Sequence, residues 1–170
     1  MSYVCDTLPL EGTNNTKDTT VARYKQGLYT VTHPEKYIGD ITKVRYMSSW
    51  ELEVHKFFDN NPRVLKWGSE CVAIPYVKPT DGRIHKYYPD YVISYITKDG
   101  EIKWELIEVK PLEQTRKSRS RNPRTKLYED VTYAINISKW EQATKRCEQQ
   151  SRLTGHNYTF RILSQNSIFK

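Results

Sequence analysis

Apolar residues recur at helical spacing in one early segment of the chain, and they predict its first regular element. Four of them fall on one face of a helix with 3.6 residues per turn: Trp50, Val54, Phe57 and Phe58. Ser48 and Ser49 are residues that cap helix N-termini, and Asn60-Asn61-Pro62 ends a helical pattern. The pattern therefore predicts a helix from Ser48 or Ser49 to about Asp59.

Runs rich in β-branched and aromatic residues predict the strands. The expected strands are Val64 to Tyr76 (interrupted at Gly68), a strand near Ile84 to Ile96, Ile102 to Lys110, and Tyr158 to Leu163. Turn signals at Pro79–Gly82 and Lys98–Gly100 separate the first three, and Gly155 precedes the last. Three consecutive strands indicate a meander, and a last strand that returns after helices joins such a sheet in parallel.

The remaining segments are polar or helical. Residues 111–126 form a basic run broken by Ser and Pro, and helices are expected at Leu127 to Ile137 and Ser138 to Ser151. Ser138, with Glu141 three residues later, has the pattern of a capping box. Residues 1–22 are expected to be a flexible arm, and residues 23–47 an irregular lead-in. The order of elements predicts an α/β fold with a mixed central sheet flanked by helices.

Length and charge narrow the class of protein. The 170 residues suffice for one ordinary domain, expected over residues 23–170 with a basic loop at 111–126. The net charge of +7 favours a polyanionic partner such as nucleic acid, and simple solubility is the alternative explanation of the charge. Three scattered cysteines favour neither a disulfide framework nor a zinc site, and the chain has neither a signal-peptide pattern nor a transmembrane run. We therefore expect a cytoplasmic protein without membrane association.

Charged residues occur where the pattern predicts buried strands. Pro89-Asp90 precedes an apolar stretch, and Glu108 and Lys110 flank Val109 on the next strand. Because side chains alternate along a strand, Glu108 and Lys110 point to the same face. A buried charge is costly unless it is paired or binds a metal. The alternatives are a turn cap for Asp90 and a surface ion pair between Glu108 and Lys110; the second fits poorly with the apolar neighbours.

This set of residues suits phosphodiester hydrolysis. Carboxylates and phosphate repel each other, and a Mg²⁺ ion between them turns the repulsion into binding and activates water. Asp90 and Glu108 are the expected ligands, with the Val109 carbonyl as a third oxygen, and Mn²⁺ is expected to substitute for Mg²⁺. Lys110 would orient the attacking water or offset charge in the transition state.

Four further residues are weaker candidates. Glu51 could join the site from the first helix or serve only in a capping box with Ser48, and the pattern does not decide between these roles. Glu70 and His85 precede the Pro-Asp strand and could line a cleft, as could Asp81. A lone histidine is more often a structural or surface residue than a catalyst.

The basic run follows the Glu-Val-Lys strand directly, so its cations are well placed to contact DNA phosphates. The alternative is a solvated linker. The DNA-binding candidates are Arg116, Lys117, Arg119, Arg121, Arg124 and Lys126.

These residues together resemble a known nuclease pattern, PD-(D/E)XK, with Glu51 upstream of Pro89-Asp90 and Glu108-Val109-Lys110. Further stretches make the chain similar to one family, the head-completion nucleases of T-even-type tailed phages. They are Lys36–Asp40, Arg45–Glu51, Trp67–Glu70, Ile74–Tyr76, Ile84–Asp90, Ile107–Pro111 and Lys139–Ala143. The likeness runs from Tyr24 to Ile168, with departures at Arg152–His156 and Gln165. A more distant likeness is to the endonuclease subunit of heteromeric transposases.

The resemblance implies a restriction-endonuclease-like core and a Mg²⁺-dependent endonuclease that processes the end of the packaged genome during head completion. On this chain the core residues of the family fall on Glu51, Asp90, Glu108 and Lys110. Implied partners are double-stranded DNA and phage head or portal proteins, in the host cytoplasm during assembly. Retention in the virion head stays open. The alternatives are a structural head protein that binds DNA or the portal without turnover, and a junction resolvase or transposase-type nuclease.

Overall fold

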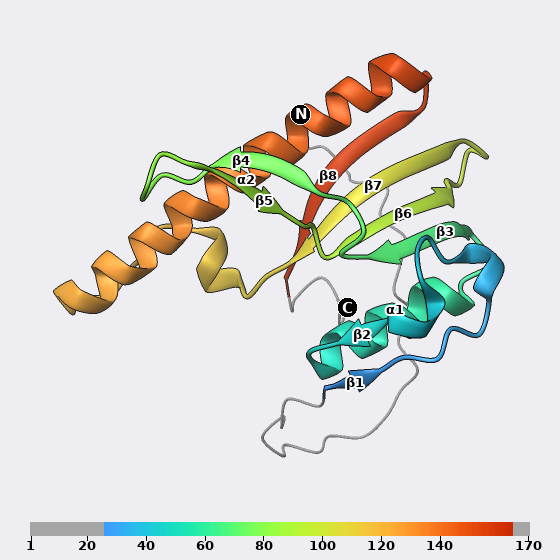
Figure 1. The fold of residues 1–170 in the computed structure, drawn as a ribbon, viewed down its shortest axis with the longest axis horizontal. Helices are drawn as coiled ribbons and strands as arrows, with labels where there is room; N and C mark the ends of the chain where they lie inside the picture. The colour runs from blue at the N-terminus through green and yellow to red at the C-terminus, as the bar shows by residue number, and fades with distance from the viewer. Residues whose placement is uncertain (1–25, 165–170) are drawn as a thin grey trace.

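A four-stranded mixed sheet lies at the centre of the fold (Figure 1) in a computed structural model that describes residues 26–164. The strand order is β3 (Val64–Ser69), β6 (Tyr91–Ile96), β7 (Ile102–Val109) and β8 (Asn157–Leu163). β3, β6 and β7 are antiparallel neighbours, whereas β8 is parallel to β7. The predicted parallel return of the last strand is therefore confirmed. The predicted arm at residues 1–22 and Gln165 lie outside the described residues.

Two predicted strands are each divided in the structure. The second half of the predicted 64–76 strand is β4 (Ile74–Val77), and the first half of the predicted 84–96 strand is β5 (Ile84–Tyr87). β4 and β5 pair with each other as a separate antiparallel hairpin, so the simple meander was wrong. Two backbone features separate the halves: Glu70 has a positive φ of 48°, and Pro89 lacks the N–H that a continuous ladder needs.

Gly68 does not interrupt β3, contrary to the prediction. A Cβ at this position would lie 2.7 Å from the Ile38 carbonyl oxygen and 2.8 Å from Cys71 Sγ. The glycine thus allows the lead-in backbone to approach β3, where the Ile38 N–H donates to the Trp67 carbonyl at 2.7 Å.

The helix α1 (Ser49–Asn60) covers one face of the sheet, and its bounds agree with the prediction. Val54 and Phe58 pack on the sheet residues Trp67 and Ile93. Between residue 26 and α1, the regular elements of the lead-in are β1 (Gly27–Leu28), β2 (Arg45–Tyr46) and two short 3-10 turns, Pro34–Lys36 and Ile41–Lys43. Buried Asp59 at the end of α1 fixes this segment, because it accepts hydrogen bonds from the Tyr29 hydroxyl and from two backbone N–H groups.

The opposite face of the sheet is covered by one long helix, α2 (Pro123–Thr154), where the sequence predicted two. Asn122 caps α2 and Pro123 occupies its first turn, which are ordinary start signals. Ser138 caps nothing; its hydroxyl donates to the Val77 carbonyl at 2.8 Å and ties α2 to the β4–β5 hairpin. Gly155, with φ of 73°, ends the helix.

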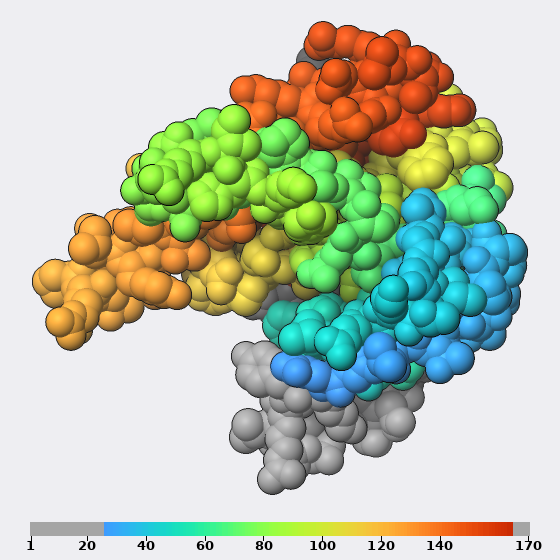
Figure 2. All heavy atoms as spheres, in the orientation of Figure 1, coloured from blue at the N-terminus to red at the C-terminus, as the bar shows by residue number. Residues whose placement is uncertain are grey.

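The layers leave the molecular surface hollowed on one side. Figure 2 shows the hollow between α2 with the β4–β5 hairpin above and the segment from β1 to α1 below. α2 begins well outside the sheet and packs on the hairpin and β8 along the rest of its length (Figure 1). None of the helices in residues 26–164 is long and apolar enough to cross a membrane.

Candidate active site

Asp90 and the end of β7 meet at one edge of the sheet. Tyr91 pairs with Ile107 in the β6–β7 ladder, which places Asp90, one residue earlier, next to Glu108 and Val109. The Val109 N–H donates to Asp90 Oδ2 at 2.6 Å, and Asp90 is half-buried. The structure therefore brings Asp90 to the Glu-Val-Lys segment through a short hydrogen bond to a charged acceptor.

Glu108 and Lys110 point to the same face, as the alternation along the strand predicts. Lys110 Nζ lies 3.0 Å from Glu108 Oε1, and Glu108 is 2% exposed. The Tyr87 hydroxyl donates to Glu108 Oε2 at 2.6 Å. A surface ion pair is thus excluded, because the carboxylate is buried and has a donor on each oxygen.

Burial and like charge control the protonation of this cluster. Burial, with the neighbouring Glu108 charge as the next cause, raises the pKa of Asp90 to about 7. Burial alone would lower the pKa of Lys110, but the charges of Glu108, Asp90 and Glu51 outweigh it and raise that pKa. Lys110 is therefore an ammonium at neutral pH, whereas Asp90 is easily protonated unless another cation stabilises its charge.

Glu51 forms a capping box in the structure. Its side chain accepts hydrogen bonds from the Met47 N–H at 2.8 Å and from the Ser48 hydroxyl at 3.0 Å, and its N–H donates back to Ser48 Oγ. Its charge nevertheless acts on Asp90 and Lys110, since it raises the pKa of both. Glu51 therefore lies beside the site but is bonded to the helix N-terminus.

The other acidic and histidine candidates are placed differently. The Glu70 N–H donates to the Asp90 carbonyl at 3.1 Å, while the Glu70 side chain is exposed. His85 lies on the hairpin and pairs with Asp81, with Nε2 2.9 Å from Oδ2. His85 thus makes a local surface contact with Asp81 and does not contact Asp90 or Glu108.

The basic run is partly ordered against α2, so the predicted loop over 111–126 was too long. Leu112–Thr115 forms a 3-10 turn, and Arg124 and Lys126 lie in the first turn of α2. Ser118 joins the run to the helix, because its N–H donates to Asp130 at 3.1 Å and its hydroxyl to Glu129. The six cationic candidates are all exposed: Arg116, Lys117, Arg119, Arg121, Arg124 and Lys126.

Two residues near the carboxylates carry no role in the sequence prediction. Tyr87 donates to Glu108, and Lys139 on α2 lies over the rings of Tyr76 and Tyr87. Both belong to stretches that carry the family resemblance, Ile84–Asp90 and Lys139–Ala143. That resemblance was the available signal, since neither residue type at these positions suggests a site by spacing alone.

The donors at this edge fit a hard divalent cation. Asp90 and Glu108 offer carboxylate oxygens and Val109 a carbonyl, the ligand types that Mg²⁺ prefers. Burial and, next, repulsion by the Glu108 charge raise the pKa of Asp90. A bound cation would relieve this repulsion. Across residues 26–164, no three His, Cys, Asp or Glu side chains form a ready-made metal cluster. A Mg²⁺ ion would therefore need water and substrate oxygens to complete its shell, which is usual for this ion.

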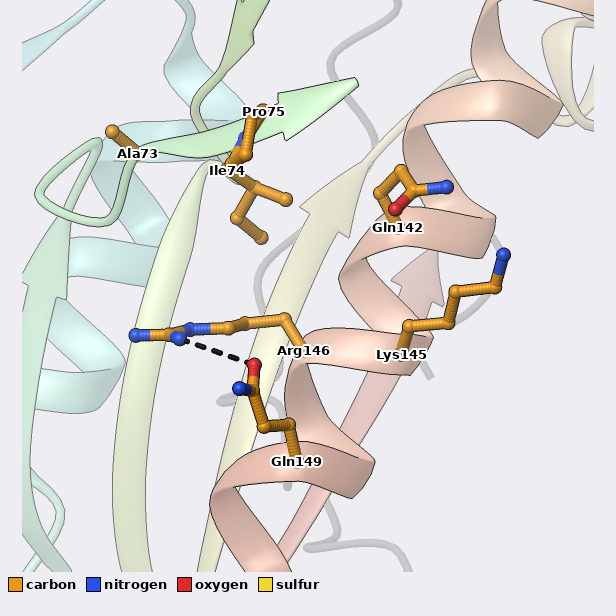
Figure 3. Close-up of a pocket in the computed structure, with 7 residues that line it drawn as sticks. All are labelled: Ala73, Ile74, Pro75, Gln142, Lys145, Arg146 and Gln149. Atoms are coloured by element: carbon orange, nitrogen blue, oxygen red, sulfur yellow. Dashed lines mark hydrogen bonds between the residues drawn. The ribbon is translucent and has the colours of Figure 1, made fainter. Parts of the chain in front are cut away.

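A separate pocket of about 290 Å³ lies between β4 and α2 (Figure 3). Its lining contains Lys145 and Arg146, and the Arg146 guanidinium donates to Gln149 at 3.4 Å. No carboxylate lines it, so it lacks the ligands of the Asp90–Glu108 edge.

Comparisons with known proteins identify the family. Residues 61–165 match the family described as "TnsA-like endonuclease N terminal", and this span exceeds half of the chain. The chain is also 30% identical over 145 residues to the "Head completion nuclease" of Enterobacteria phage T4, which covers 78% of this chain and 86% of that protein. The chain belongs to the head-completion nuclease family and contains a TnsA-like endonuclease N-terminal domain. No solved structure matches.

Membership of the head-completion nuclease family confirms the predicted resemblance. The mixed sheet with helices on both faces is consistent with a TnsA-like endonuclease fold, so the predicted fold class is confirmed as well. The residues matched to the TnsA-like family include Asp90, Glu108 and Lys110 but begin after Glu51. The shared domain therefore contains the β6–β7 edge and not the N-terminus of α1.

Proposed function

We propose that this protein is a Mg²⁺-dependent DNA endonuclease with a PD-(D/E)XK site, acting on the packaged genome end during phage head completion. The observation that carries the proposal is the joint placement of Asp90, the Val109 backbone and the Glu108–Lys110 pair at one sheet edge. The nuclease named among the relatives supports the reaction class, and its head-completion role supports the setting.

The residues would divide the work as follows. Asp90, Glu108 and the Val109 carbonyl would hold Mg²⁺, with Mn²⁺ as a substitute, and the ion would supply charge for the phosphate and an activated water. Lys110 is protonated because its pKa is raised, so it would donate a hydrogen bond to the water or to a phosphate oxygen rather than accept a proton. Glu51 would add negative charge beside the metal and water shell.

Substrate contacts would come mainly from the backbone of the DNA. The exposed cations of the basic run suit phosphates and predict binding without sequence readout. Phage head or portal proteins are the expected assembly partners, with action in the host cytoplasm during assembly.

A second function is favoured by one observation. Both Glu108 oxygens already have donors, from Tyr87 and Lys110, as they would in a protein that binds DNA or the portal without turnover. If the protein is instead a nuclease, the contacts of Tyr87 and Lys110 with Glu108 would have to loosen when the substrate enters.

Cleavage assays separate the two functions. Purified protein is incubated with supercoiled circular, linear duplex and branched DNA in Mg²⁺, in Mn²⁺ or in EDTA, beside Asp90→Ala and Lys110→Ala. We expect cutting by the wild type with either metal only, and loss in both variants. Binding without cutting under varied metal and salt would favour the structural role. Cutting that persists in both variants would contradict the site, and a strong preference for branched DNA would indicate a resolvase.

A further inference from the structure

Lys139 projects from the middle of α2 toward the β4–β5 hairpin, where no role is yet assigned to it. Its Nζ lies 5.6 Å from the ring centre of Tyr76 and 5.5 Å from that of Tyr87. Both distances are within the range of cation–π contacts, in which the ring face attracts the cation. Two aromatic faces therefore fix the ammonium group at the junction of α2 and the hairpin, the packing of which is visible in Figure 1.

Within residues 26–164, no carboxylate lies at ion-pair distance from the ammonium group of Lys139. Among residues 26–164 it forms no ion pair, although it is half-buried and burial lowers its pKa. A partly desolvated cation held on aromatic rings alone is incompletely compensated. The position is therefore ready for an anion from outside the chain.

Its charged surroundings connect Lys139 to the carboxylate edge. Glu108 and Asp90 favour its charged form, whereas Lys110 and Lys78 oppose it. Tyr87 forms the physical link, since its ring supports Lys139 and its hydroxyl donates to Glu108. Lys139 is thus electrostatically coupled to Lys110 of the candidate active site and to Lys78, which directly follows β4.

We propose that Lys139, supported by Tyr76 and Tyr87 and assisted by Lys78, forms a phosphate-binding subsite for the DNA strand that enters the candidate active site. The subsite would bind the phosphodiester next to the one that is cut and would guide the strand along the junction of α2 and the hairpin. It reads no base, because an ammonium on aromatic rings presents only positive charge and donors to a phosphate. The inference rests on the proposed nuclease function.

The test measures DNA affinity and cleavage separately. Lys139→Met keeps the length and apolar stem of the side chain, Lys139→Arg keeps the charge, and Lys145→Met removes an exposed lysine from the same helix as a control. Binding of a short fluorescent duplex is measured in EDTA across a salt series, and cleavage in Mg²⁺. Thermal melts establish that each variant folds.

We expect Lys139→Met to weaken binding about five- to tenfold and to reduce the slope of log K against log salt by about 1. Lys139→Arg should retain most affinity, and Lys145→Met should change it less than about twofold. An unchanged DNA affinity and an unchanged salt slope in Lys139→Met would overturn the subsite. If the wild type still cleaves DNA in that case, the proposed nuclease function stands. Lower cleavage with unchanged affinity would also overturn it, because Lys139 would then only position Glu108 through Tyr87. Equal weakening by Lys145→Met would overturn it in favour of general charge, and a wild type that neither binds nor cuts DNA would refute both proposals.

Discussion

Replacing Asp90 by asparagine should stabilise the metal-free protein above neutral pH. The Val109 N–H can still donate to the amide oxygen, so the substitution removes charge and keeps the short hydrogen bond. Burial and the Glu108 charge raise the pKa of Asp90 from 3.8 to about 7. The folded protein therefore holds this proton more tightly than the unfolded chain, and stability falls as the pH rises from about 4 to about 7.

The size of the effect follows from the shift. A difference of about three pKa units corresponds to about 4 kcal/mol, which partial exposure of Asp90 reduces to about 2–4 kcal/mol. Asp90→Asn should lack this loss, so in EDTA its free energy of unfolding should exceed that of the wild type by that amount at pH 8. At pH 4 the two proteins should be nearly equal.

Urea denaturation in EDTA from pH 4 to pH 9 measures the difference. Asp81→Asn is the control, because hydrogen bonding lowers the pKa of exposed Asp81 and its removal should bring no gain at pH 8. Identical pH profiles for the wild type and Asp90→Asn would refute the reasoning, since Asp90 would then carry no buried, repelled charge. The same variant should also lose cleavage, so that stability and activity change in opposite directions.

Three other predictions test the surroundings of the site. Tyr87→Phe leaves one Glu108 oxygen without its donor and should cost about 1–3 kcal/mol of stability by urea denaturation, while equal stability would show that water replaces the hydroxyl. Glu51→Gln should lower the cleavage rate more than Ser48→Ala does, and Ser48→Ala should cost about 1 kcal/mol of stability through loss of the helix cap. A larger loss of cleavage in Ser48→Ala than in Glu51→Gln would mean that Glu51 serves only as a cap. Arg121→Ala should reduce the salt slope of DNA binding by about 1 in fluorescence titrations, and an unchanged slope would mean that this residue contacts no phosphate.

The sequence predicted correctly those features that depend on residues close together in the chain. The helix α1 was predicted closely because its signals are local: the apolar face lies within it, and Ser48 and Pro62 lie within two residues of its ends. The same-face placement of Glu108 and Lys110 follows from strand alternation alone. The sequence predicted that Asp90 and Glu108 lie on neighbouring strands, but not the contact of Asp90 with Val109. That contact depends on the register of β6 against β7, which is set by pairing across the sheet.

Misassigned elements reflect contacts made far along the chain. Ser138 has the pattern of a helix cap, but tertiary packing gives its hydroxyl the Val77 carbonyl and leaves α2 continuous. Gly68 looks like a strand breaker, yet it admits the Ile38 backbone. Lys139 approaches the site only because α2 packs on the hairpin, a contact between segments about 60 residues apart that no spacing rule reveals.

The role of Glu108 is tested most directly against Glu105, a second buried glutamate on β7. Glu105 lies on the other face of the strand, where it pairs with Arg161 at 2.7 Å and Lys103 at 3.2 Å, and it serves as the matched control. The measurement is the single-turnover rate of supercoiled DNA cleavage in Mg²⁺ by the wild type, Glu108→Gln and Glu105→Gln. The account predicts at least about a 10²- to 10³-fold loss in Glu108→Gln and near wild-type rates in folded Glu105→Gln. Equal rates in all three proteins would contradict it.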